Sequence, residues 1–321
     1  MLDDEHHPLP QSSRDDNVYT LGSIGRHNVV LACLPYGQMG NHSAAVVATR
    51  LSYTFPAVRF GLMVGIGGGC PRDQFDVRLR DVVVSKPGRS NGGVVQFDFG
   101  RTVEDGRFIR NGVLNAPPNV LLNAISVIQA THNSFGKRME QHLSSIDPTL
   151  QEEGYSYQGE DIDLLFHPSY EHEVGSWGIC GSCDRSRILT REERPNPKSP
   201  RVRYGTVASG NQVIRHSRAR DHVSYETGAL CIEMEAAGLM NSFPCLLVRG
   251  VCDYADSHKN KAWQPYAAAT AAAYAKELLF VVPETPTSTR LMKKVNTSEM
   301  DLLDQGGYPF VQLILLSMTH I

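Results

Sequence analysis

The sequence lacks the features that mark several protein classes. No apolar run reaches the roughly 18 residues that a membrane-spanning helix needs, and the late run Val311 to Leu316 is far too short. The first residues are acidic and polar, which is not the pattern of a signal peptide. Basic residues are not in excess, because 31 Lys and Arg stand against 34 Asp and Glu, whereas nucleic-acid binders are usually basic. These absences predict a soluble, cytoplasmic protein without nucleic-acid or membrane partners.

Cysteine is scarce, odd in number and scattered along the chain. Seven cysteines in 321 residues indicate reduced thiols in an intracellular protein rather than a secreted disulfide scaffold. Four of them lie in apolar, strand-like runs, where buried free cysteine is common. These four are Cys33, Cys231, Cys245 and Cys252.

The pair Cys180-Gly-Ser-Cys183 stands apart from the other cysteines. It follows His167 and His172, so one interpretation is a zinc site of two histidines and two cysteines. The spacing is not that of a standard zinc finger, and the surrounding sequence is loop-like. The alternative is a turn with two free thiols, and we predict no metal in the active site.

Hydrophobic residues make up 41% of the chain and charged residues 20%, which is a globular composition. Strand-like and helix-like segments alternate, and this order is typical of an α/β fold with parallel strands. We expect strands over 19–24, 28–35, 58–66, 81–86, 93–99, 202–208, 229–234 and 245–251. We expect helices over 41–53, 120–131 and 262–282, and the start of another at 235–242.

One domain accounts for most of the chain. Residues 1–18 form a polar lead-in, and 19–282 form the domain, with an irregular insertion at about 132–200. Residues 283–321 are expected to be a linker and a poorly ordered tail that packs poorly.

Two segments of small residues follow predicted strands. The run Gly65-Ile-Gly-Gly-Gly69 would let a ligand approach the backbone, although it fits neither a dinucleotide fingerprint nor a P-loop. The run Ala208-Ser-Gly-Asn-Gln-Val-Ile214 lies where ligands bind in open α/β sheets. The alternatives are ordinary turns at the edge of the sheet.

Acidic residues follow two later strands. Glu233 and Glu235 lie beside an apolar strand, where an unpartnered carboxylate would be costly to bury. Asp253 follows directly after another, where a catalytic acid would be placed. The alternatives are the acidic first turn of a helix and a helix N-cap.

Together these segments resemble the nucleoside phosphorylase/nucleosidase superfamily, which includes purine nucleoside and uridine phosphorylases and methylthioadenosine/S-adenosylhomocysteine nucleosidases. The resemblance spans about Tyr19 to Val282 and is closest to the fungal version that precedes NACHT, ankyrin or tetratricopeptide segments. It rests on Phe60-Gly-Leu-Met-Val-Gly-Ile-Gly-Gly-Gly69, Asp81-Val-Val-Val-Ser-Lys-Pro87, Gln96-Phe-Asp-Phe-Gly100, Glu233-Met-Glu-Ala-Ala-Gly-Leu-Met240 and Arg249-Gly-Val-Cys-Asp-Tyr-Ala-Asp-Ser-His-Lys-Asn260.

The resemblance implies a three-layer α/β/α fold with a central mixed, twisted sheet, and cleavage of a ribosyl C–N bond. It makes Asp253 the acid that protonates the purine and Glu235 the carboxylate on the ribose hydroxyls. Substrate-binding residues would be Gly67, Gly68, Gly69, Ser209, Val213, Ile214, Glu233 and Met234. It implies no cofactor, a small-molecule nucleoside or nucleotide partner, and a homo-oligomer.

Two departures from the superfamily bear on the reaction. Met63 and Ile66 stand where phosphorylases have an Arg and a Ser for phosphate, and neither can donate a hydrogen bond, which favours water as the nucleophile. The first strand and helix of fungal members have no counterpart before Tyr19, so we expect an uncovered neighbouring strand. Three functions stay open: a purine nucleosidase in nucleoside metabolism or as a receptor-type effector domain, a phosphorylase with phosphate as co-substrate, and a truncated, catalytically impaired ligand-binding module.

Overall fold

The computed structural model describes the whole chain except residue 73 and residues 173–179, 285–310 and 318–321. Its described strands are β1 (Asp4–His6), β2 (Tyr19–Ile24), β3 (His27–Cys33), β4 (Gly61–Gly69), β5 (Val82–Ser85), β6 (Val94–Gln96), β7 (Gly100–Thr102), β8 (Phe108–Arg110), β9 (Val202–Ser209), β10 (Ala229–Glu233), β11 (Cys245–Asp253) and β12 (Val311–Ser317). Its α-helices are α1 (Asn41–Thr54), α2 (Asn119–Ala130), α3 (His132–Ser144), α4 (Pro148–Leu150), α5 (Ser217–Thr227) and α6 (Gln264–Val281).

A mixed sheet forms the centre of the molecule. Its order is β1-β2-β3-β12-β4-β10-β9-β5-β11, and β6 pairs with β9. The strand β11 also runs parallel to β4 along its whole length, so β4, β10, β9, β5 and β11 pair in a closed ring. The expected mixed α/β sheet is confirmed, and part of it closes on itself.

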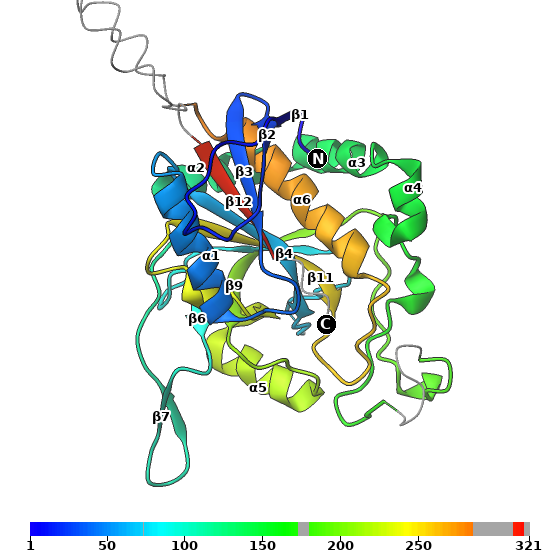
Figure 1. The fold of residues 1–321 in the computed structure, drawn as a ribbon. Helices are drawn as coiled ribbons and strands as arrows, with labels where there is room; N and C mark the ends of the chain where they lie inside the picture. Colours follow the sequence, from blue (N-terminus) through cyan, green and yellow to red (C-terminus); the bar gives the residue numbers. More distant parts are fainter. Residues whose placement is uncertain (73, 173–179, 285–310, 318–321) are drawn as a thin grey trace, which may run out of the picture.

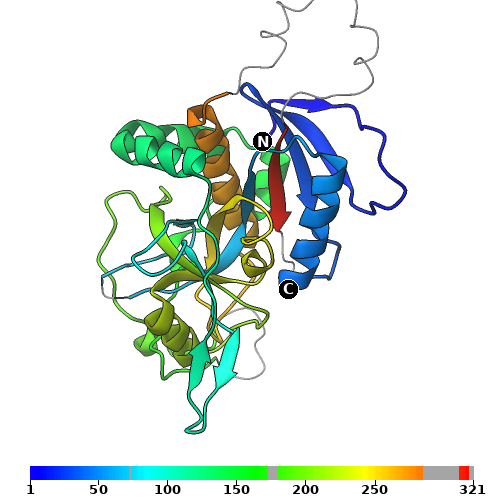
Figure 2. The same cartoon turned by 90° about the vertical axis from the view of Figure 1, so that its left-hand side faces the viewer.

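Alternating side chains along the central strands build two apolar cores. On β4, Leu62 and Val64 pack with α2 and α6, whereas Met63 packs in the other core with α1. The same alternation along β11 directs Leu246 and Val248 to the first core and Leu247 to the second. Helices therefore cover both faces of the sheet (Figures 1 and 2).

The strand β12 lies in the middle of the sheet. It runs parallel to both of its neighbours, with Ile314 opposite Leu31 of β3 and Leu62 of β4. Figure 2 shows it in red between the two strands. Residues 311–317 thus occupy the position beside β4 that was expected to be uncovered. Residues 285–310 and 318–321 of the tail expected over 283–321 lie outside the described residues.

Most expected elements occur within a few residues of their predicted bounds. The glycine run differs, because Gly67 to Gly69 continue β4 instead of forming a loop. The insertion is less irregular than expected, since α3 lies within it. The helix α5 was not predicted, and the helix expected at 235–242 is only a single 3₁₀ turn, Ala236–Gly238. Cys33 is exposed at the end of β3 rather than buried.

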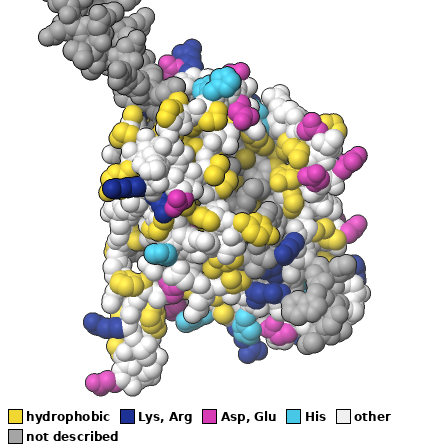
Figure 3. All heavy atoms as spheres, viewed as in Figure 1, with side chains coloured by type: hydrophobic (Ala, Val, Ile, Leu, Met, Phe, Trp, Pro, Cys, Tyr) yellow, Lys and Arg dark blue, Asp and Glu magenta, His cyan; other side chains and the backbone are white. Residues whose placement is uncertain are grey.

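The surface carries charges of both signs. On the face seen in Figure 3, acidic and basic side chains are interspersed with apolar ones, in keeping with the net charge of −3. Within the described ranges, no helix has the length and apolarity needed to cross a bilayer.

The position of β12 generates a stability prediction. Ile314→Pro removes a backbone N–H from a strand that is paired on both sides. We therefore expect the free energy of unfolding to fall by at least about 2 kcal/mol. Chemical denaturation of the full chain measures the difference, with Ile314→Val as the matched control. Equal midpoints for the two variants would contradict the pairing.

Candidate active site

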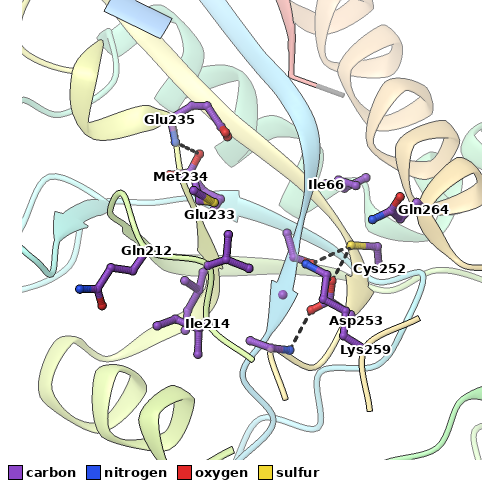
Figure 4. Close-up of a pocket in the computed structure, with 15 residues that line it drawn as sticks. Ile66, Gln212, Ile214, Glu233, Met234, Glu235, Cys252, Asp253, Lys259 and Gln264 are labelled. Atoms are coloured by element: carbon purple, nitrogen blue, oxygen red, sulfur yellow. Dashed lines mark hydrogen bonds and ion pairs between the residues drawn. The ribbon is translucent and has the colours of Figure 1, made fainter. Parts of the chain in front are cut away.

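A pocket opens to solvent where β4, β10 and β11 end, and the empty space in and above it, open solvent included, is about 480 Å³. Eight of the ten predicted site residues line it: Gly67, Gly68, Val213, Ile214, Glu233, Met234, Glu235 and Asp253. Further lining residues include Ile66, Gln212, Cys252, Lys259 and Gln264 (Figure 4).

The two predicted catalytic acids enter the pocket from opposite sides. Glu235 follows β10, Asp253 ends β11, and both of these strands pair with β4. Gly68 of β4 is opposite Ile232 on one side and Asp253 on the other. Figure 4 shows the acids on either side of β4. The two carboxyl groups therefore lie on opposite sides of the glycines of β4.

A buried arginine holds the glutamate side of the pocket. The guanidinium of Arg249 is fully buried, forms a close ion pair with Glu233 through Nη2, and lies 3.5 Å from Oε2 of Glu235. Burial alone would lower the pKa of Arg249, but the two carboxylates outweigh it and raise the pKa. Arg249 is therefore charged, and its charge fixes both glutamates.

Glu233 has other partners besides Arg249. Its carboxylate accepts hydrogen bonds from the backbone N–H groups of Glu235 and Ala236, each at 3.2 Å. The carboxylate thereby caps the 3₁₀ turn that follows, much as the helix-start alternative supposed. Glu233 lines the pocket but serves mainly to position the chain around Glu235.

Asp253 is buried and anchored at both carboxylate oxygens. Its Oδ1 accepts the N–H of Ala255 at 2.8 Å, and its Oδ2 lies 3.2 Å from the ammonium of Lys259. Burial opposes the charge on Lys259, yet the attraction of Asp253 is stronger and raises the Lys259 pKa. The thiol of Cys252 also donates to Oδ2, at 3.1 Å, and burial raises the pKa of that thiol far above its usual range. No helix starts directly after Asp253, so the N-cap alternative is wrong.

The glycines of β4 are required by close contacts. A Cβ on Gly67 would lie 2.5 Å from Sγ of Cys231, and one on Gly68 would lie 3.0 Å from Oδ1 of Asp253. Only hydrogen leaves space for the neighbouring strands and for a ligand above them.

Apolar side chains form a further wall of the pocket. Val213 is 38% exposed, which is high for an apolar residue beside a cavity, and Ile214 is half-buried next to it. Gln212 and Gln264 add amide groups. A flat apolar ring with polar edges would fit this combination.

Two predicted residues do not line the pocket. Ser209 is buried, accepts the N–H of Ala237 at 2.9 Å and bonds Asn41. Gly69 packs against Val251 and Val77, where a side chain would collide. Both lie near the site and shape it, without reaching the cavity.

Sequence reasoning missed the importance of Arg249, Lys259 and Gln264. Arg249 and Lys259 lie within the segment 249–260 that carried the family resemblance, but neither was assigned a role. A charged residue inside an apolar run such as 245–251 is a usable signal, because a buried charge needs a partner.

Arg249 generates a second prediction. Arg249→Met leaves two buried carboxylates without their cation, so we expect a loss of about 3 to 5 kcal/mol in unfolding free energy. The matched control is Arg26→Met, which breaks an exposed pair with Glu284 and should change stability by less than about 1 kcal/mol. A comparable effect of both substitutions in denaturant titrations would refute the central role of Arg249.

The sequence of this chain is similar to those of several known proteins. No family model matches the chain. A nucleotide-binding leucine-rich repeat (NLR)-like protein of Hyaloscypha variabilis is 46% identical over 283 residues, which is 88% of this chain and 28% of that protein. The chain thus spans little more than a quarter of that relative. A 5′-methylthioadenosine/S-adenosylhomocysteine nucleosidase of Mycobacterium bovis is 24% identical over 83% of the chain and 85% of its own length.

Solved structures show the same fold. Futalosine hydrolase of Helicobacter pylori superposes with a TM-score of 0.51 at 17% identity, covering 87% of this chain and 88% of that one. A 5′-methylthioadenosine/S-adenosylhomocysteine nucleosidase of Neisseria meningitidis, bound to methylthio-immucillin-A, gives 0.51 at 16% identity, covering 87% and 90%. The chain thus shares its fold with these solved hydrolases and nucleosidases and is a distant sequence relative of the Mycobacterium bovis nucleosidase.

Proposed function

We propose that the chain hydrolyses the N-glycosidic bond of a purine nucleoside or adenine nucleotide. The observation that carries this proposal is the pair of buried acids, Glu235 and Asp253, on opposite sides of the glycine floor of one pocket. Cleavage of such a bond creates negative charge on the base and positive charge on the sugar. A proton donor therefore helps at the base and a carboxylate helps at the sugar.

Asp253 acts on the leaving base. When the C–N bond breaks, its electron pair stays with the base. Asp253, which must take up a proton from solvent before this step, passes it to the base and makes the base a better leaving group. The bonds from Ala255 and Lys259 hold this side chain in place, which supports its use as a positioned acid. Val213 and Ile214 would pack against the ring of the base.

Glu235 acts on the sugar. A carboxylate that accepts from the ribose hydroxyls orients the ring and stabilises positive charge at the anomeric carbon. The contact with Arg249 orients this carboxylate. Met234, beside Glu235 in the pocket, offers an apolar surface beneath the ribose.

Water is the proposed nucleophile. Met63 is buried in a core and Ile66 lines the pocket, so neither side chain offers a hydrogen bond to phosphate. The relatives from Mycobacterium bovis and Helicobacter pylori are named as a nucleosidase and a hydrolase, which supports the same choice. The fungal relative named NLR-like supports a role as a receptor-type effector domain. A homo-oligomer and a cytoplasmic location stay predictions.

Base release tests this proposal. Purified full chain is incubated with adenosine, methylthioadenosine or ATP, with and without phosphate, and free adenine is followed by chromatography. We expect release without phosphate, a fall of about 10²- to 10⁴-fold in Asp253→Asn because the acid is lost, and no change in the control Asp105→Asn. Asp105 is exposed in the β7–β8 hairpin, where it pairs with Arg107.

The other outcomes are equally specific. Release only with phosphate, with ribose 1-phosphate as co-product, would establish a phosphorylase instead. Binding of all three compounds without release of adenine from any would establish the catalytically impaired ligand-binding module.

The glycine floor generates a further prediction. Gly68→Ala places a methyl group 3.0 Å from Asp253 and 2.8 Å from Ala255, so the acid must shift. We expect kcat for the best substrate to fall by up to about 100-fold, with a smaller change in thermal stability. Gly88→Ala is the control, because a methyl group there would meet its nearest atoms at 3.4 Å, an ordinary contact distance. An unchanged kcat in Gly68→Ala would remove the case for a tightly positioned Asp253.

A further inference from the structure

A second cluster of reactive side chains lies beside the pocket. The ligand-capable atoms of His172, Cys180 and Cys183 all lie within 4.8 Å of one another, a convergence found in no other described group of metal-binding side chains. The cluster borders a neighbouring cavity that shares Cys252, Asp253 and Lys259 with the active-site pocket. Nothing in the proposed nucleosidase reaction uses it.

His258 gives an independent sign that a ligand belongs there. His258 is only 6% exposed, yet neither ring nitrogen has a hydrogen-bond partner among the described residues. A buried imidazole without partners loses its hydration without compensation. Its ring lies 5.4 Å from the ring of His172, measured between centroids. A metal ion would satisfy a nitrogen that the protein leaves unsatisfied.

The surroundings hold these side chains in place before any ion binds. The ring of His258 stacks on Phe166 with centroids 4.0 Å apart, and the thiol of Cys180 lies 4.0 Å from the carbonyl oxygen of His258. The backbone N–H of His172 donates to Oγ of Ser257 at 2.9 Å. These contacts join the 160–190 region to the loop that follows Asp253.

We propose that His172, Cys180 and Cys183 bind a zinc-class divalent cation, with His258 as the fourth ligand. Two thiolates and two imidazoles are a standard tetrahedral donor set for zinc, with bonds of about 2.0–2.3 Å. Binding displaces one proton from each cysteine thiol, so the two thiolates balance the ion's two positive charges. The inference is independent of the proposed enzymatic activity.

The structure corrects the ligand set that the sequence suggested. The converging group of three contains neither His167 nor His258. His167 is exposed and already bonds Ser169 through Nδ1 at 2.8 Å, whereas His258 is buried with both ring nitrogens unpartnered. His258, from a segment about 80 residues further along, takes its place in our assignment. The site therefore joins two distant parts of the chain instead of forming a local knuckle.

The ion would stabilise the loop that holds the partners of Asp253. Its ligands lie on both the insertion and the 254–260 loop, and that loop holds Ala255 and Lys259, the partners of Asp253. Joining the two segments limits the movement of these partners. Loss of metal should then loosen the loop without removing a group that contacts substrate.

Metal content tests the proposal directly. We expect the full chain, purified without chelator, to carry one zinc per chain by elemental analysis, and cobalt substitution to give a thiolate-to-cobalt charge-transfer band. Cys180→Ser, Cys183→Ser and His258→Ala should each reduce bound metal to background or weaken its retention against a chelator. Cys33→Ser, which removes an exposed thiol outside the cluster, should retain the metal.

Two measurements keep the test decisive if a variant fails to fold. In the native chain, bound metal should protect Cys180 and Cys183 from alkylation while Cys33 reacts. A native chain without zinc and without a cobalt charge-transfer band would overturn the proposal, as would a Cys180–Cys183 disulfide found by mass spectrometry. Full retention of metal by folded His258→Ala would overturn the four-ligand assignment.

Discussion

The charge of Arg249, buried completely between strands, is the constraint on which the pocket depends. A guanidinium in that position is tolerated only with anionic partners close by, and Glu233 and Glu235 provide them. Because Arg249 lies on β11 and the glutamates follow from β10, this ion pair joins the two strands that flank β4. The same strand β11 ends at Asp253, so the pair also fixes the distance between the two acids of the site.

Space is the second constraint. The strands on either side of β4 come so close that Gly67 and Gly68 cannot carry side chains. The glycines thus permit both the tight pairing and the approach of a ligand to the backbone. Their role in the sheet and their role in the pocket have one physical origin, which explains why they form strand rather than the loop that glycine composition favours.

The apolar strands and the Ala-rich helix α6 could be predicted from sequence, because local periodicity encodes them. The helices α3 and α5 could not, since both are polar: a buried Arg220 and Ser224 give α5 little apolar pattern to detect. Family motifs located the acids and Val213 with Ile214, but not Lys259, whose importance comes only from its distance to Asp253. Likewise, His258 and Cys180 are far apart in sequence, so no local pattern could join them.

The strand β12 was the hardest element to foresee, because its partners β3 and β4 lie more than 240 residues earlier. This separation has a consequence for biosynthesis. Both neighbours leave the ribosome long before residues 311–317 exist, so β3 and β4 cannot be joined through β12 until then. Two adjacent strand edges stay unpaired in the nascent chain throughout that time, exposed to chaperones or to other strands. The ring of β4, β10, β9, β5 and β11 does not include β12, so it can form first, and β12 then joins β4 to β3.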